Sequence, residues 1–104
     1  MEGGLTSAPR HRIRWTEKAL QYLEAAADYI AEDSPQAAEA FVKRVFSGTI
    51  VLAQHPEIGR AGRCKGTREL VVTSTPYIVA YRVKGEQIEI LRVLHGARKW
   101  PIKI

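Results

Sequence analysis

The stretch YIVAYRVKGEQIEILRVL, residues 77–94, decides the fold of this chain. Its two halves, Tyr77–Val83 and Ile88–Leu94, are rich in β-branched and aromatic residues, which is typical of strands. The residues KGEQ between them include Gly85, and a glycine at this place favours a tight turn. The stretch therefore predicts an antiparallel hairpin. The run ELVVTS, residues 69–74, predicts a third strand that extends the hairpin into a meander.

Two amphipathic helices are predicted before this meander. In EKALQYLEAAADYIAED, residues 17–33, apolar residues recur at helical spacing, and Thr16 can cap the first turn. The apolar positions are Leu20, Leu23, Ala27 and Ile30. Ser34 followed by Pro35 predicts a second helix, which should end before Pro56 because a residue preceding proline avoids the helical region. Its expected buried face consists of Ala38, Phe41, Val42, Val45, Thr49 and Leu52. The short link between the helices indicates an antiparallel helical hairpin.

The N-terminal part adds one more strand. RHRIRW, residues 10–15, alternates basic and apolar side chains, so Ile13 and Trp15 share one side of a short strand. We expect this strand to join the sheet beside the meander. A strand, two helices and three strands in this order indicate an α+β fold, with both helices on one face of a mostly antiparallel sheet. Residues 1–9 predict a flexible tail, and residues 10–104 a single domain.

Composition excludes several classes of protein. No apolar run approaches the ~18 residues of a membrane span, and the first residues lack the apolar core of a signal peptide. The single cysteine allows no internal disulfide, which fits the cytoplasm. Motifs of nucleotide-dependent enzymes and serine hydrolases are absent, and no zinc-ligand spacing occurs, so we expect neither cofactor nor metal. The net charge of +5 favours nucleic acid, acidic proteins or anionic membranes as partners.

Basic residues gather in the segment between the second helix and the meander. HPEIGRAGRCKGT, residues 55–67, has three glycines and no periodicity, so we expect an irregular loop in which Cys64 is incidental. Four basic side chains occur within nine positions with no acid between them: Arg60, Arg63, Lys65 and Arg68. They are a candidate footprint for nucleic acid or an acidic surface, and the alternative is a solvated loop.

The sequence HGARKWP near the C-terminus offers a second candidate site. Arg98 could hold a phosphate or a carboxylate through two hydrogen bonds, and Trp100 could stack on a partner or cover the edge of the core. His95 could exchange protons near neutral pH, or simply bond to backbone at a strand end. Arg82 lies in the middle of a predicted strand and needs solvent or a partner, for which Glu89 on the next strand is a candidate.

These segments together resemble the RelE/ParE superfamily of bacterial toxins from type II toxin–antitoxin modules. The matching features are HPEIGR, GTRELVV, PYIVAYRV, IEILRVLHGAR and the closing WP, which occur in the same order over residues 11–101. The resemblance implies a compact cytoplasmic toxin. It also implies a small antitoxin that neutralises it, expected to be acidic and ParD-like.

The superfamily contains two mechanisms. RelE-type members cut mRNA on the ribosome, whereas ParE-type members poison DNA gyrase without established catalytic residues. By motif, the two RelE-type lysines fall on Glu69 and Val71, and the arginine after the next strand's first aromatic residue falls on Ile78. The late arginine is retained as Arg98, but no tyrosine follows it.

These replacements bear on the choice of mechanism. Cleavage by a ribose 2′-hydroxyl needs a base, an acid and cations near the developing charge, and here a carboxylate and two apolar residues replace three cations. We therefore expect a gyrase-binding toxin rather than a catalyst. The predicted target-binding residues are Arg60, Arg63, Lys65, Arg68, Arg82, Arg98 and Trp100. A ribosome-dependent endoribonuclease, with Glu69, His95 and Arg98 as its catalytic residues, is the alternative. A non-toxic relative that only binds its antitoxin is a third possibility.

Overall fold

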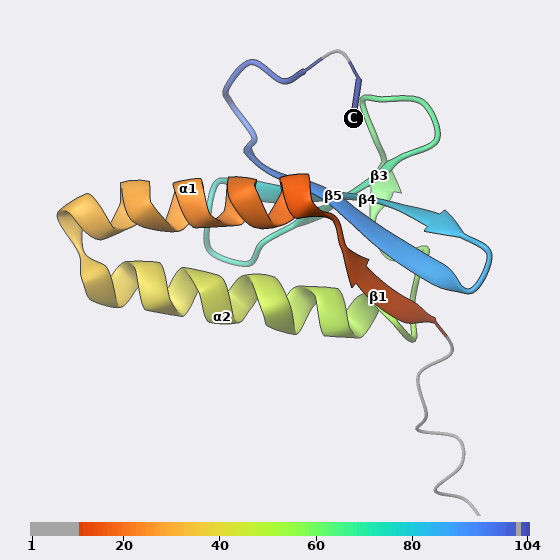
Figure 1. Ribbon diagram of the computed structural model, residues 1–104, viewed down its shortest axis with the longest axis horizontal. Coiled ribbons are helices and arrows are strands. Elements are labelled where there is room, and N and C mark those ends of the chain that lie inside the picture. The colour runs from red at the N-terminus through yellow and green to blue at the C-terminus, as the bar shows by residue number, and fades with distance from the viewer. Residues whose placement is uncertain (1–10, 102) are drawn as a thin grey trace, which may run out of the picture.

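The computed structural model describes residues 11–101 and 103–104, and it contains a helical hairpin beside a five-stranded sheet (Figure 1). The elements are β1 (Arg12–Trp15), α1 (Glu17–Asp33), α2 (Pro35–Leu52), β2 (Arg60–Ala61), β3 (Arg68–Val71), β4 (Tyr77–Lys84) and β5 (Gln87–His95). The predicted α+β architecture is confirmed. The expected flexible tail, residues 1–9, lies outside the described residues.

Strands β4 and β5 form the centre of the sheet, whose order is β1-β5-β4-β3-β2. They pair antiparallel through a tight turn in which Gly85 has a φ of 62°, as the sequence predicts. A register shift pairs Ala80 with Arg92 and Tyr81 with Ile90, which marks a β-bulge. β3 pairs antiparallel with β4, and β1 pairs parallel with β5. The N-terminal strand therefore joins the meander as expected.

Both helices begin at the predicted caps. The Thr16 hydroxyl oxygen accepts a hydrogen bond from the amide of Ala19, and the hydroxyl donates to the carbonyl of Ile90 on β5. Ser34 caps α2 by accepting from the amide of Ala37. The first cap therefore does two things: it satisfies an amide of the first helical turn and fastens α1 to the sheet.

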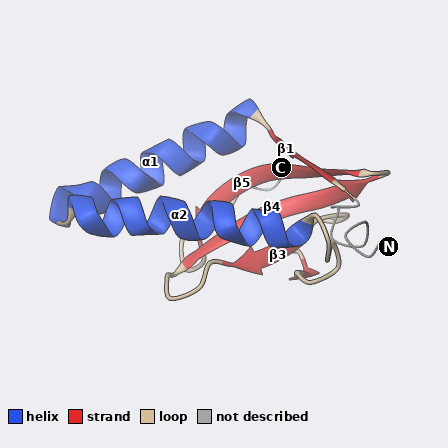
Figure 2. Ribbon diagram, turned by 90° about the horizontal axis from the view of Figure 1, so that it is seen from below, coloured by secondary structure: helices blue, strands red, loops and turns tan. Residues whose placement is uncertain are grey.

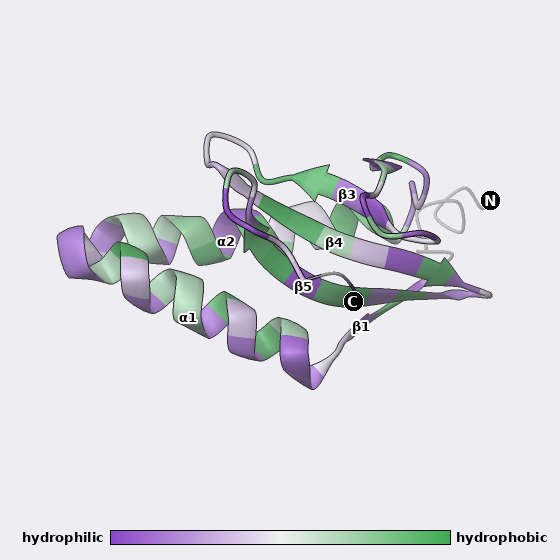
Figure 3. Cartoon of the chain, turned by 90° about the horizontal axis from the view of Figure 1, so that it is seen from above, coloured by the Kyte–Doolittle hydropathy of each residue, from purple (hydrophilic) through white to green (hydrophobic). Residues whose placement is uncertain are grey.

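The core lies between the helical hairpin and one face of the sheet, and Figure 2 shows both helices on that face. Figure 3 shows hydrophobic colouring along much of β5 and the adjoining part of β4. The predicted inner face of α2 is confirmed, since Phe41, Val45 and Leu52 are buried. One expectation for α1 is wrong: Leu20 is 47% exposed, whereas Ala19 is fully buried. The small alanine side chain allows α1 to approach β5 closely at this point.

The segment of residues 55–67 is more ordered than the sequence predicts. Arg60–Ala61 forms β2, which pairs antiparallel with the start of β3. Tyr81 anchors the preceding turn, because its hydroxyl donates to the carbonyl of Pro56 at 2.8 Å and accepts from the amide of Gly59 at 2.9 Å. Burial raises the pKa of Tyr81 above its ordinary value. A Cβ atom at position 59 would lie 2.5 Å from the Tyr81 hydroxyl oxygen, so this contact requires glycine.

Tyr81→Phe tests this anchor. We expect the free energy of unfolding at pH 7 to fall by about 1–3 kcal/mol, because a buried amide and a buried carbonyl lose their partner. The raised pKa favours the neutral phenol. The contribution of the Tyr81 hydroxyl to the free energy of unfolding is therefore complete below pH 10.0, and it is lost as the pH rises through the folded-state pKa. Urea denaturation at pH 7 and at about pH 11 measures both effects.

The matched control is Tyr29→Phe, because Tyr29 is exposed and its hydroxyl makes no hydrogen bond among the described residues. Equal stability of the two variants at pH 7 would show that the anchor contributes nothing.

Candidate target-binding surface

Glu89 lies on the sheet face opposite the helices, where it pairs with two arginines. Its neighbours Ile88 and Ile90 face the helices, so strand alternation turns Glu89 to the other side. Its carboxylate accepts a 2.7 Å hydrogen bond from Arg82 Nε and a 3.2 Å bond from Arg14 Nη1. The Arg82 hydrogen bond holds the pKa of Glu89 below its ordinary value. The predicted pair of Arg82 and Glu89 is confirmed, and Arg14 is an additional partner.

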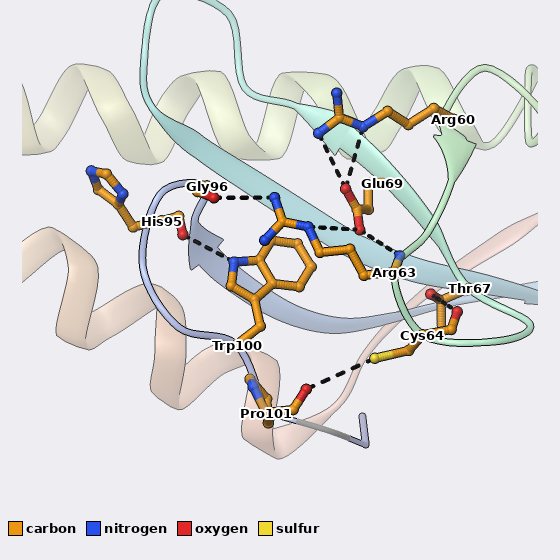
Figure 4. Close-up of polar contacts among 9 residues, drawn as sticks. All are labelled: Arg60, Arg63, Cys64, Thr67, Glu69, His95, Gly96, Trp100 and Pro101. Atoms are coloured by element: carbon orange, nitrogen blue, oxygen red, sulfur yellow. Dashed lines mark hydrogen bonds and ion pairs between the residues drawn. The ribbon is translucent and has the colours of Figure 1, made fainter.

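Glu69 on β3 likewise pairs with two arginines, Arg60 and Arg63 (Figure 4). Its side chain is only 2% exposed. One carboxylate oxygen accepts hydrogen bonds from Nε and Nη2 of Arg60, at 3.3 and 3.2 Å. The other accepts from the backbone amide of Arg63 at 2.8 Å and lies 3.6 Å from that residue's Nε. Both carboxylate oxygens are therefore occupied within the protein.

Arg63 connects the basic loop to the C-terminal segment (Figure 4). Its guanidinium lies 3.8 Å from the centre of the Trp100 ring and donates a 3.1 Å hydrogen bond to the carbonyl of Gly96. The Trp100 indole in turn donates to the carbonyl of His95 at 3.0 Å. Trp100 is thus held within the molecule by a cation–π contact and a hydrogen bond. A further contact between the loop and the C-terminal segment joins Cys64 Sγ to the carbonyl oxygen of Pro101, at 3.9 Å.

These contacts change the interpretation of the four basic loop residues. Arg60 and Arg63 pair with Glu69, and Arg68 donates to the carbonyls of Glu57 and Gly59. Lys65 alone of the four is an exposed cation without an ion pair among the described residues. Glu69 therefore offsets only part of the positive charge of the four side chains, and Arg60 and Arg63 stay partly exposed while they are held in place. The reason is that the fold brings Glu69 back against the loop.

His95 and Arg98 make local contacts. The His95 Nδ1 accepts a 3.1 Å hydrogen bond from the amide of Ala97, and the ring meets Tyr77 edge-on at 5.3 Å. Figure 4 shows the imidazole turned away from Glu69, so the two do not form an acid–base pair in this structure. The Arg98 guanidinium lies 4.8 Å from the centre of the Tyr29 ring.

Two neighbouring hollows lie around these residues, with volumes of about 390 and 330 Å³. Both are lined by Tyr29, Tyr77, His95 and Arg98, and we call them together the aromatic–basic pocket. One hollow also includes Tyr22 and Lys99, and the other includes Phe41 and Arg44. Sequence analysis missed the two helix tyrosines. Their seven-residue spacing, which places them on one helix face, is the signal that could have found them.

A separate apolar groove of about 400 Å³ lies between α2 and β3. Its lining includes Val51, Ile58, Leu70 and Val71, with the basic side chains of Lys43 and Arg44 beside them. The pairing of β2 with β3 covers only Arg68 and Glu69, so Leu70 and Val71 have no partner strand on that edge among the described residues. We call this region the α2–β3 groove.

Other kinds of site are not seen within residues 11–101 and 103–104. No helix in this range is long and apolar enough to cross a membrane. No cluster of three or more His, Cys, Asp or Glu side chains in the same range could hold a metal ion.

The helical hairpin on one face of a five-stranded sheet and the paired arginines on the other define the class of protein as a small α+β domain. The family described as the ParE toxin of the type II toxin–antitoxin system parDE matches residues 13–100. The protein Y4kP of Sinorhizobium fredii is 46% identical over 92 residues, covering 88% of this chain and 95% of that relative. Toxin RelE2 of Caulobacter vibrioides is 39% identical over 87 residues, covering 84% and 97%. This chain therefore belongs to the ParE toxin family of type II toxin–antitoxin systems.

Solved structures agree with this assignment. The chromosomal ParDE toxin–antitoxin system of P. aeruginosa contains a chain with a TM-score of 0.74 and 30% identity, over 83% of this chain and 96% of that one. The RelBE2 toxin–antitoxin complex of Mycobacterium tuberculosis contains one with a TM-score of 0.54 and 25% identity, over 85% and 99%. The predicted RelE/ParE resemblance is confirmed.

Glu69→Gln tests whether Glu69 holds the basic loop and the C-terminal segment together. The amide group would turn N–H donors toward arginines that are themselves donors, so we expect a loss of about 1–3 kcal/mol in the free energy of unfolding. Amide hydrogen exchange at residues 96–100 should become faster, because Arg63 no longer has a fixed position under Trp100. Urea denaturation and hydrogen exchange are the two measurements.

Glu89→Gln is the matched control, since it removes a carboxylate with two arginine partners that does not contact the C-terminal segment. Unchanged exchange at residues 96–100 in Glu69→Gln, or equal acceleration in both variants, would contradict the role given to Glu69.

Proposed function

We propose that this toxin inhibits DNA gyrase by binding it, and that it does not cut RNA. The observation that carries the proposal is that the carboxylate of Glu69 is buried and paired with arginines. Glu69 stands at a position where RelE-type toxins carry a lysine. Each of its oxygens is taken by an arginine, and its side chain is buried. A general base must reach the proton that it removes, and a carboxylate in these contacts is not available for that.

The remaining positions support the same proposal. Val71 lines the α2–β3 groove, and Ile78 is buried beside Gly96, so neither supplies a cation or a proton. The Nδ1 atom of His95 is occupied by a backbone amide. Arg98 can bind an anion, but one arginine cannot perform the two proton transfers that RNA cleavage needs.

A ribosome-dependent mRNA endoribonuclease is the second candidate, because a relative with 39% identity carries the name toxin RelE2. In that case Glu69, His95 and Arg98 would be the catalytic residues. Glu69 would then have to leave both arginines before it could act, which makes this candidate the weaker one. Either target implies a cytoplasmic location.

The proposed neutralising partner is an acidic, ParD-like antitoxin whose extended or helical segment covers the α2–β3 groove. An exposed apolar groove with an open strand edge suits a segment that folds on binding, and Lys43 and Arg44 beside it attract acidic residues. The sheet face around Arg82 is less suitable for the antitoxin, because Arg82 already pairs with Glu89.

Assays with purified toxin distinguish the two targets. We expect inhibition of DNA supercoiling by gyrase and no cleavage of ribosome-bound mRNA. His95→Ala should retain part of the inhibition, because it costs about 1 kcal/mol of stability and removes one ring contact with Tyr77 but no proton transfer that inhibition needs. Gel analysis of supercoiled plasmid and primer extension on the mRNA measure the two activities. Ribosome-dependent cleavage that His95→Ala reduces by ~100-fold or more would identify a ribonuclease instead.

A charge placed in the α2–β3 groove tests the antitoxin surface. Val71→Asp should weaken binding of the antitoxin encoded beside this gene by about tenfold or more, because an unpaired carboxylate would be buried against apolar side chains. Val83→Asp is the matched control, since Val83 is a similarly exposed strand valine that does not line the groove. Isothermal titration calorimetry gives both affinities. Equal loss in the two variants would place the antitoxin elsewhere.

A further inference from the structure

We infer that the aromatic–basic pocket is the place where this toxin receives an acidic segment of its protein target. The inference rests on the proposed function, which names gyrase as that target, and it adds the site and the chemistry of recognition. The pocket lies where α1, β4 and the C-terminal segment meet, through Tyr29, Tyr77 and Arg98.

An unpaired hydroxyl in the pocket is the first observation. Tyr77 is only 5% exposed, and it lines both hollows of the pocket. Its ring is fixed by Phe41, at 4.9 Å between ring centres, and by His95, at 5.3 Å. Its hydroxyl has no hydrogen-bond partner within the described part of the chain and is not closed off from solvent, so it can donate to a molecule in the pocket. A bound acceptor, such as a carboxylate, would satisfy it.

The charge around the pocket is the second observation. Arg44, Arg98 and Lys99 line the two hollows, and no carboxylate lines either of them. None of these three cations has an ion pair among the described residues, whereas four arginines near the opposite sheet face share Glu69 and Glu89. Arg98 is held over the Tyr29 ring, which leaves its N–H groups available for an anion.

The remaining lining favours a protein segment over a nucleic acid. Apolar side chains and tyrosines make up most of it, and the apolar ones include Ala26, Ile30, Phe41, Val93 and Leu94. A pocket of this kind accepts an apolar side chain whose acidic neighbours meet the surrounding cations. A nucleic-acid strand needs a longer track of cations along its phosphates. The lining of the pocket contains three cations, Arg44, Arg98 and Lys99, which suit a short acidic segment.

Two variants that keep the shape of the pocket test the inference. Tyr77→Phe removes the unpaired hydroxyl, and Arg98→Gln removes the charge. Each should weaken binding to purified gyrase by about tenfold, measured by surface plasmon resonance, and the loss in Arg98→Gln should shrink at high salt. Affinity for the antitoxin should change less than threefold, roughly the scatter expected for a site outside its groove. Thermal unfolding followed by circular dichroism checks that both variants are folded.

Arg12→Gln is the charge control, because Arg12 is exposed on β1 and does not line the pocket. Its affinity for gyrase should equal that of the wild type. Wild-type protein that does not bind gyrase would overturn both the proposed function and the inference. Wild-type binding with no loss in Tyr77→Phe and Arg98→Gln would overturn the inference alone.

Two further outcomes would also overturn it. If the variants lose the antitoxin but keep gyrase, the pocket serves the antitoxin. A fluorescently labelled single-stranded oligonucleotide supplies the second comparison. If it binds the wild type and Arg98→Gln abolishes that binding while affinity for gyrase persists, the pocket is a nucleotide site.

Discussion

The antiparallel pairing of β4 with β5 is the constraint on which the other contacts depend. It places Tyr81 and Ile90 on the side that the helices cover, and it leaves Glu89 on the other side. Leu91 has no partner in the ladder, so the bulge allows Ile90 and Val93 to face the same core although they are three residues apart. β1 and β3 then pair with the outer edges of this central hairpin.

Two buried carboxylates hold four of the arginines of the chain in place. The net charge of +5 suggests a broadly basic surface, yet Glu69 and Glu89 each accept two arginines near the same sheet face. Four arginines that share two carboxylates still leave an excess of positive charge on that face, whereas Arg44, Arg98 and Lys99 form a second basic group beside tyrosine rings with no carboxylate in the lining.

The α2–β3 groove and the aromatic–basic pocket lie next to each other. Arg44 lines both the α2–β3 groove and one hollow of the aromatic–basic pocket. In the proposed scheme, an antitoxin in the groove would lie next to the place where the target is recognised. Neutralisation would then need no change in the shape of the toxin, because an acidic segment at Arg44 competes for the same charge and the same space.

The sequence by itself determined the elements, their order and the face that α2 buries. These features follow from local signals: hydroxyl caps at Thr16 and Ser34, helical periodicity, and a glycine turn between two β-branched runs. The pair of Arg82 and Glu89 could also be predicted, because a tight hairpin fixes which residues face one another across it.

Only the tertiary structure decided which side chains from distant segments meet. No local pattern indicates that Glu69 takes up Arg60 and Arg63, or that Ala19 is buried in place of Leu20. The aromatic–basic pocket joins Tyr29, Tyr77 and Arg98 from three separate segments. Their meeting depends on how closely α1 packs on the sheet and where the chain turns after β5. Both are properties of packing, which periodicity and composition do not encode.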